Sequence, residues 1–170
     1  NRVSYASLSS DPLAVTWDTP VEEHYNIAVT PHVGPTVMVR REMTRTPHSI
    51  TVYQGTVDNG SDYGKINVVR ASQDTAFFLR AGETAVVDLG QNMVGWPAFT
   101  VKGAKGTQVK VCVAEMLNDS GLASRSNFGP EGSIFIKNYR SAKSKIQYVL
   151  SGDPTGETYH STFTFFGFRY

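Results

Sequence analysis

The sequence predicts an all-β fold, a two-sheet antiparallel β-sandwich of the jelly-roll type with little or no helix. The apolar residues recur mostly with period two in short runs, which is the pattern of strands that bury one face. The 170 residues also include 15 Gly and 8 Pro, which interrupt every window long enough to show helical periodicity. Several short strands separated by turn signals are typical of sandwiches and jelly rolls.

Each predicted strand is a short apolar run bounded by turn residues. In chain order the runs are residues 36–40, 49–53, 65–70, 84–89, 98–102, 108–115, 145–150 and 161–170. Residues 90–97 are predicted to form a turn, and residues 57–64 and 117–134 to form long connections. Both connections are rich in Asp, Asn, Ser and Gly, whose side chains hydrogen-bond nearby backbone and stabilise tight loops. Loops of this kind at the end of a sandwich commonly carry binding sites.

Length and repeat content predict a single module over residues 1–170, because no internal repeat or composition change marks a boundary. The chain starts without Met and stops inside the apolar run 163–170. We therefore expect a module excised from a longer protein.

Charge and cysteine content exclude several classes of function. The 16 Lys and Arg residues balance 15 Asp and Glu, for a net charge of +1, so no nucleic-acid partner is expected. No apolar stretch is long enough to cross a bilayer, so no membrane partner is expected either. The single cysteine, Cys112, excludes a disulfide framework within the chain and a cysteine-based metal site.

Calcium is the metal that the sequence favours, because the four histidines show no zinc-site spacing. Segment 58–64 reads D-N-G-S-D-Y-G and starts like an EF-hand loop, but Val69 occupies the position of the bidentate Glu. The segment is either half of another kind of calcium site or a hairpin turn.

Glu115 is predicted to lie on the apolar face at the end of its strand, because it continues the alternation of Val109, Val111 and Val113. A carboxylate there needs a cation or several hydrogen bonds. Calcium, Arg125 or Arg140 would satisfy it, and a structural salt bridge is an equal alternative. Pairs of carboxylates suited to glycosidase chemistry occur in any chain of this size, and no common hydrolase or nucleotide-binding motif is present.

Trp96 lies between Gly95 and Pro97, and the proline restricts its backbone to extended conformations. An indole held beside the amides of Gln91 and Asn92 is the arrangement that a sugar-binding platform requires. The alternative is that Trp96 is a core aromatic.

Ordered motifs along residues 86–170 resemble those of bacterial α-L-rhamnosidases, glycoside hydrolase family 78. Residues 88–96 read D-L-G-Q-N-M-V-G-W and resemble that family's D-x-G-Q-N-x-V-G-W. Four further segments are similar to family motifs in the same order: V-K-G-A-K-G-T at 101–107, A-E-M-L-N-D-S-G at 114–121, N-Y-R-S-A at 138–142 and F-T-F-F-G-F-R-Y at 163–170.

The resemblance implies the jelly-roll module that precedes the catalytic helical barrel, identified as carbohydrate-binding module family 67. It implies that the module is not itself an enzyme and binds terminal L-rhamnose through calcium. The implied ligand-binding residues are Asn92, Gly95, Trp96, Asp58, Asn59 and Glu115, and the implied metal ligands are Asp58, Asn59, Asn118 and Asn127.

The implied partners are L-rhamnose-containing glycans and the catalytic domain of the parent enzyme in cis. The implied location is periplasmic or extracellular, in a bacterium that degrades polysaccharides. The alternative is a structural accessory domain that packs on the catalytic barrel and binds no ligand of its own.

Overall fold

The computed structural model describes residues 28, 30, 31, 33–35 and 38–170. The chain divides into two units, Asn1–Val39 and Arg40–Tyr170, and the second unit carries the fold. Residues 36 and 37 of the strand predicted at 36–40 lie outside the described residues. Residues 38–40 are not in a strand, so that part of the prediction is wrong. The prediction of one module over residues 1–170 stays a prediction.

The second unit is built from eleven short strands, and among the described residues no α-helix occurs. The strands are β1 (Ser49–Val57), β2 (Lys65–Ser72), β3 (Thr84–Asp88), β4 (Met93–Gly95), β5 (Ala98–Val101), β6 (Gln108–Cys112), β7 (Met116–Leu117), β8 (Ile134–Phe135), β9 (Lys145–Val149), β10 (Glu157–His160) and β11 (Phe166–Phe168). Three single-turn 3-10 helices also occur: η1 (Arg41–Met43), η2 (Ala123–Arg125) and η3 (Lys137–Tyr139).

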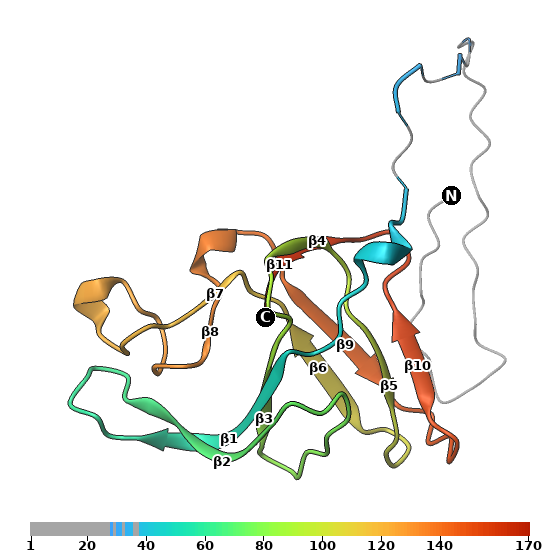
Figure 1. Cartoon of the computed structure of the whole chain (residues 1–170). Helices are drawn as coiled ribbons and strands as arrows, with labels where there is room; N and C mark the ends of the chain where they lie inside the picture. The colour runs from blue at the N-terminus through green and yellow to red at the C-terminus, as the bar shows by residue number, and fades with distance from the viewer. Residues whose placement is uncertain (1–27, 29, 32, 36–37) are drawn as a thin grey trace, which may run out of the picture. The chain divides into compact units, whose positions relative to one another are not determined.

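All of these strands pair antiparallel (Figure 1). One sheet has three strands in the order β2-β1-β3, and the others are the pairs β10-β5, β11-β4, β6-β9 and β7-β8. The predicted all-β, antiparallel class is therefore confirmed. None of the described residues forms a helix that is long and apolar enough to cross a membrane.

The core receives side chains from β1, β2, β3, β9 and β11 and from residues that directly follow β6 and β9. Ile50 and Val52 point inward from β1, and their alternation with less buried neighbours is the period of two that predicts this strand. The other buried apolar residues among those described are Ile66, Val86, Val113, Ala114, Ile146, Leu150 and Phe168.

An aromatic cluster joins the pair β10-β5 to the pair β6-β9. The Phe99 and Tyr159 ring centroids lie 5.3 Å apart, and those of Tyr148 and Tyr159 lie 5.4 Å apart. The Tyr148 hydroxyl donates to Glu157 Oε2 at 2.9 Å. Glu157 also accepts hydrogen bonds from the backbone N–H groups of Ser151 and Gly152. These backbone donors are the main reason that the pKa of Glu157 falls to about 2.

Candidate functional site

The strand pair β4-β11 carries the D-L-G-Q-N-M-V-G-W segment. The chain leaves β3 at Asp88, whose Oδ1 accepts a hydrogen bond from the Gly90 backbone N–H at 2.7 Å. Gly90 has a φ of +77°, a conformation that glycine adopts without strain. The turn directs the chain into β4, where Gly95 pairs with Phe166 and Val94 with Gly167.

A bidentate ion pair joins the start of this segment to the end of the chain. Arg169 donates from Nε to Asp88 Oδ1 at 2.8 Å and from Nη2 to Asp88 Oδ2 at 2.9 Å. The Asp88 side chain is 18% exposed and that of Arg169 is 38% exposed. The Arg169 hydrogen bonds, and then the Gly90 N–H, lower the pKa of Asp88 below its ordinary value of 3.8. Asp88 is therefore a structural anchor of the β4-β11 pair.

The outward face of β4-β11 carries apolar side chains and is bordered by the Glu115 carboxylate, since a Cβ on Gly167 would lie 3.4 Å from Glu115 Oε1. Val94 is 76% exposed, and Trp96, two residues further along, is 36% exposed. On the partner strand, Phe166 pairs with Gly95. Phe165, one residue earlier, therefore lies across from Trp96, and it is 67% exposed. Since side chains two residues apart share a face of a strand, Val94, Trp96 and Phe165 lie on one side. We call these three residues the outer apolar face.

Trp96 is thus not a fully buried core residue, which is the alternative that the sequence leaves open. Gln91 and Asn92 are exposed in the turn before β4, and Gly95, at the end of β4, is half-buried. The Gln91 side-chain oxygen accepts a 3.4 Å hydrogen bond from Arg45. An exposed indole beside exposed amides is compatible with the predicted sugar platform, which stays a prediction.

The predicted calcium pair, Asp58 and Asn59, lies in the turn between β1 and β2. Asp58 Oδ1 accepts from the Gly60 N–H at 2.8 Å, and Asn59 Oδ1 accepts from the Ser61 hydroxyl at 2.5 Å. The Asn59 amide donates to Glu131 Oε2 at 3.0 Å. Asp58 therefore stabilises the hairpin turn, and Asn59 stabilises both the turn and its contact with the β7-β8 loop.

The other two predicted metal ligands hold the β7-β8 loop together. Asn118 is buried; its Oδ1 accepts from the Phe128 N–H at 2.9 Å and its Nδ2 donates to the Ser133 hydroxyl at 2.9 Å. The Asn127 amide donates to Asp119 Oδ1 at 2.8 Å. The loop thus uses these amides for its own backbone and neighbours.

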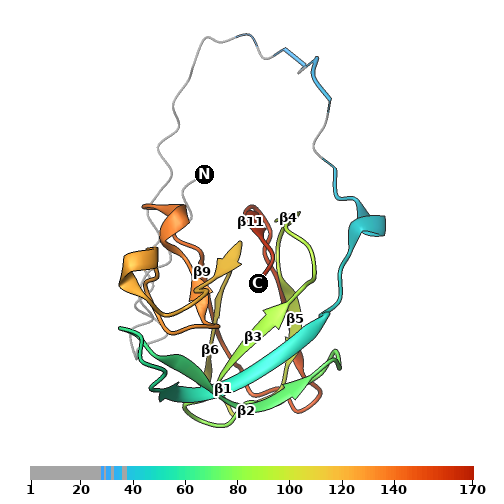
Figure 2. The ribbon, with the colours of Figure 1, turned by 60° about the vertical axis from the view of Figure 1, so that its left-hand side comes forward.

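The predicted binding residues fall into two separate places: Glu115 lies beside Gly167 and so near the segment of Asn92, Gly95 and Trp96, and the other predicted residues lie in the β1–β2 turn and the β7-β8 loop. In both views the connection from β4 to β5 lies well apart from the β1–β2 turn (Figures 1 and 2). That turn instead contacts the β7-β8 loop, where the Ala123 N–H donates to Asp62 Oδ2 at 2.8 Å. Within the described part of the chain, no three His, Cys, Asp or Glu side chains are grouped so that they could hold a metal. Calcium binding stays a prediction.

Glu115 does not lie on the apolar face, so that prediction is wrong. Strand β6 ends at Cys112, and the two residues that follow, Val113 and Ala114, are both buried. The alternation therefore stops before Glu115, which is exposed. Its Oε2 accepts a hydrogen bond from the Asn138 amide at 2.5 Å.

Two features of this site are not predicted from the sequence. Arg169 is the partner of Asp88, and nothing in the local sequence marks a contact across 81 positions. The outer apolar face does have a signal: Met93, Val94 and Trp96 are apolar at both even and odd positions. A short run that is apolar at successive positions is consistent with a strand that is covered on both faces.

Short antiparallel strands with no α-helix among the described residues define an all-β domain. The model of the family described as "Bacterial alpha-L-rhamnosidase concanavalin-like domain" matches residues 79–170, more than half of the chain, and the chain belongs to this family. The predicted sandwich and the resemblance to α-L-rhamnosidases are confirmed.

Three curated relatives are named α-L-rhamnosidase. The chain is 45% identical over 85 residues to that of Streptomyces avermitilis, a match covering 50% of this chain and 7% of the relative. It is 39% identical over 88 residues to that of Formosa agariphila and 36% identical over 88 residues to that of Alteromonas sp., each match covering 52% of this chain and 8% of the relative. The matched part therefore spans a small fraction of these relatives. No solved structure gives a significant match to the chain.

Proposed function

We propose that this chain is a non-catalytic accessory domain of an α-L-rhamnosidase and packs on another domain of that enzyme through the outer apolar face. The observation that carries the proposal is the exposure of Val94, Trp96 and Phe165 on one side of β4-β11. Clustered apolar side chains of this kind mark interaction surfaces. The three relatives are more than ten times longer than the matched segment, because that segment makes up 7–8% of them. Their remaining length provides room for a neighbouring domain, and the proposed occupant is the catalytic barrel that the resemblance implies.

Replacing Val94 with Glu tests the packing role. In the isolated chain the melting temperature should change little, because Val94 is already 76% exposed. Affinity for the separately produced rhamnosidase catalytic domain should fall by about tenfold, since a buried, unpaired charge opposes association. Calorimetry measures this affinity. Val68→Glu, at an exposed valine of β2, is the matched control and should leave the affinity unchanged. Equal loss with both variants, or with neither, contradicts the proposed surface.

The second candidate function is binding of terminal L-rhamnose through calcium, as in carbohydrate-binding module family 67. The exposed indole of Trp96 beside Asn92 favours it, because an apolar plate next to amides suits the two faces of a sugar. Asp58 and Asn59 would be the calcium ligands. Their distance from the Trp96 segment requires that the ion and the indole act at separate places, which makes this function the second choice.

Calorimetry of the chain with L-rhamnose, with calcium and then with EDTA, tests the second candidate. We expect a Kd on the order of 10⁻⁴ M; loss with EDTA would place the sugar at the ion, and loss in Trp96→Ala would place it at the indole. Phe128→Ala, at an exposed aromatic residue of the β7-β8 loop, serves as the control. Absence of binding rejects this candidate, and binding that survives EDTA rejects the calcium.

A further inference from the structure

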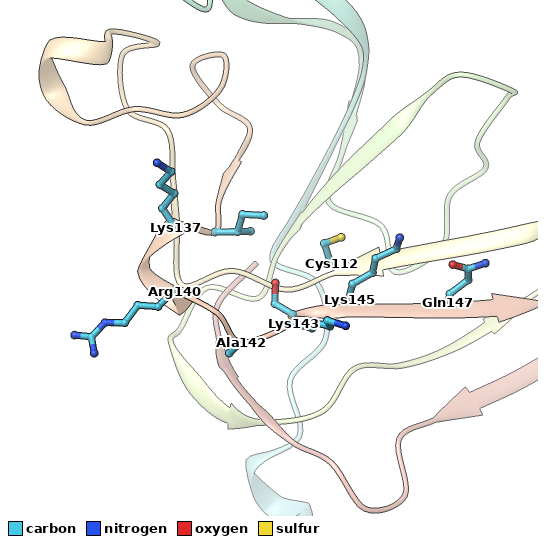
Figure 3. A pocket seen from close by; sticks show the side chains of 9 residues that line it. Cys112, Lys137, Arg140, Ala142, Lys143, Lys145 and Gln147 are labelled. Carbon is cyan, nitrogen blue, oxygen red and sulfur yellow. The ribbon is translucent and has the colours of Figure 1, made fainter. Parts of the chain in front are cut away.

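A pocket with a basic lining opens where η3 leads into β9, on the side of β6 that faces away from the core (Figure 3). It encloses about 520 Å³, which is within the range of ligand sites. Four of its nine lining residues, Lys137, Arg140, Lys143 and Lys145, are basic, and none is acidic. The remaining lining includes Cys112 and Gln147. We call this the basic groove.

The register of β6 and β9 extends the basic groove along the sheet. Cys112 pairs with Lys145, and Lys110 pairs with Gln147. All four side chains are exposed, whereas Ile146, between Lys145 and Gln147, is buried. Since alternate residues share a face, these four form one outward surface. In Figure 3 the side chains of Cys112, Lys145 and Gln147 lie close together along the two strands.

The cations of this surface are not neutralised within the described part of the chain. None of Lys110, Lys137, Lys143 and Lys145 has an ion-pair partner among the described residues. Lys137 lies over the Phe128 ring at 2.9 Å from its centroid, which keeps its charge. The acid adjoining η3 is Glu115, and its carboxylate is hydrogen-bonded to the Asn138 amide.

The turn at the rim of the groove is conformationally unusual. Arg140 has φ 57° and ψ −110°, a region that residues other than glycine rarely adopt. The Ala142 N–H donates to the Tyr139 carbonyl at 2.9 Å and closes the turn around Arg140. Arg140 points its guanidinium away from the groove (Figure 3), so it can contact only a ligand that extends past the rim. Rare backbone conformations of this kind concentrate at functional sites.

We infer that the basic groove and the outward face of β6-β9 bind an acidic polysaccharide, through carboxylate or sulfate groups carried on its sugars. Clustered lysines attract an anionic chain although the whole protein is nearly neutral, because the field of a local patch is felt within about 10 Å. The Gln147 side chain, whose amide donates to Gln108 Oε1 at 3.2 Å, lies exposed on the same face and keeps a carbonyl oxygen that can accept from sugar hydroxyls.

A polysaccharide fits this surface better than nucleic acid does. Single-stranded nucleic acids are held largely by stacking of bases on aromatic side chains, and no aromatic residue lines the groove. The family of the chain consists of domains of carbohydrate-active enzymes, which favours a glycan over an acidic protein. The inference does not depend on the packing role, since that role uses β4-β11.

Protection of Cys112 from alkylation tests the inference in the full chain. Cys112 is the single cysteine, is exposed and lines the groove, so iodoacetamide reports on this place alone. Polygalacturonate, which carries carboxylates, and dextran sulfate, which carries sulfates, are compared with neutral dextran at low salt. We expect one or both polyanions to slow alkylation at least fivefold, with reversal in 0.5 M NaCl and no effect of dextran.

Variants locate the binding and exclude other polyanions. K143Q/K145Q should raise the half-protecting concentration about fivefold, as expected for the loss of two surface charge contacts, and K110Q/K137Q provides a second pair should the first fold poorly. R40Q/R41Q is the matched control: Arg41 is the first residue of η1, Arg40 precedes it, and both are exposed. This variant removes the same charge and should change the half-protecting concentration by less than twofold. No protection, equal effects of all variants, or stronger protection by a DNA oligonucleotide or polyglutamate at equal charge overturns the inference.

Discussion

Replacement of Gly121 with alanine is expected to destabilise the domain by about 3 kcal/mol and to lower its melting temperature by roughly 10 °C. Gly121 has a φ of +68°, and an added Cβ would press on the Gly64 carbonyl oxygen and approach Ser61 Oγ at 2.5 Å. These atoms belong to the β1–β2 turn, whose Tyr63 N–H donates to the Gly121 carbonyl at 3.0 Å. The substitution therefore forces the β1–β2 turn and the β7-β8 loop apart. Thermal unfolding measures the effect.

Gly60→Ala is the matched control for this prediction. Gly60 lies in the same turn with a φ of +79°, but a Cβ there would meet no atom within 4 Å. Only backbone strain is added, about 1 kcal/mol. If the two variants lose the same stability, the close approach of the loops does not matter, and the account of this contact is wrong.

Asp88→Asn is expected to cost about 1–2 kcal/mol, because it removes the charge from a bidentate pair with Arg169 and places an amide donor against a guanidinium. The expected loss is modest because Arg169 is 38% exposed. Chemical denaturation measures the change. Asp119→Asn is the control, since the Asp119–Arg125 pair is more than half exposed on both sides, and it should change stability much less.

Acid should abolish the difference between the wild-type chain and Asp88→Asn. The pKa of Asp88 is lowered in the folded protein, so the ion pair stabilises the fold fully above the ordinary value of 3.8. That stabilisation is lost as the pH falls from about 4 through the lowered pKa. Melting temperatures of the two proteins should therefore converge between pH 6 and pH 2. A difference that stays constant over this range would contradict the assigned role of Asp88.

The sequence predicts β1, β2, β3, β5, β6 and β9, but it misses the four-residue strand β10 and predicts a turn at 90–97, where β4 forms. Ile50 and Val52 on β1 show why a strand can be predicted: their alternation with less buried neighbours is a local property of the chain. Strands β7 and β8 cannot be predicted, because each has two residues and their pairing depends on a loop held by the contact between Glu131 and Gly64. The prediction for Glu115 fails because the alternation stops after Cys112, where two consecutive residues are buried.

The binding residues are harder to predict than the strands. The connections predicted at 57–64 and 117–134 form loops rich in Asp and Asn, except for their end residues Val57, Leu117 and Ile134, which lie in strands. The sequence does not indicate that these loops contact each other and lie apart from the Trp96 segment, because periodicity assigns a residue to a face and not to an end of the sheet. The basic groove likewise arises only when pairing brings together β6 and β9, which are distant in sequence, as in the partners Cys112 and Lys145.

The Asp88–Arg169 pair has a consequence for the order in which the chain acquires its structure. Strand β4 pairs with β11, and the ion pair beside it joins residues that are 81 positions apart. Contacts that close such long stretches of chain form slowly, since the entropy of the intervening segment is lost before the contact is gained. Until then Val94 and Trp96 belong to an unpaired apolar edge, which is the kind of surface that aggregates during synthesis. We therefore expect nascent chains to depend on chaperones most strongly before β4 and β11 have paired.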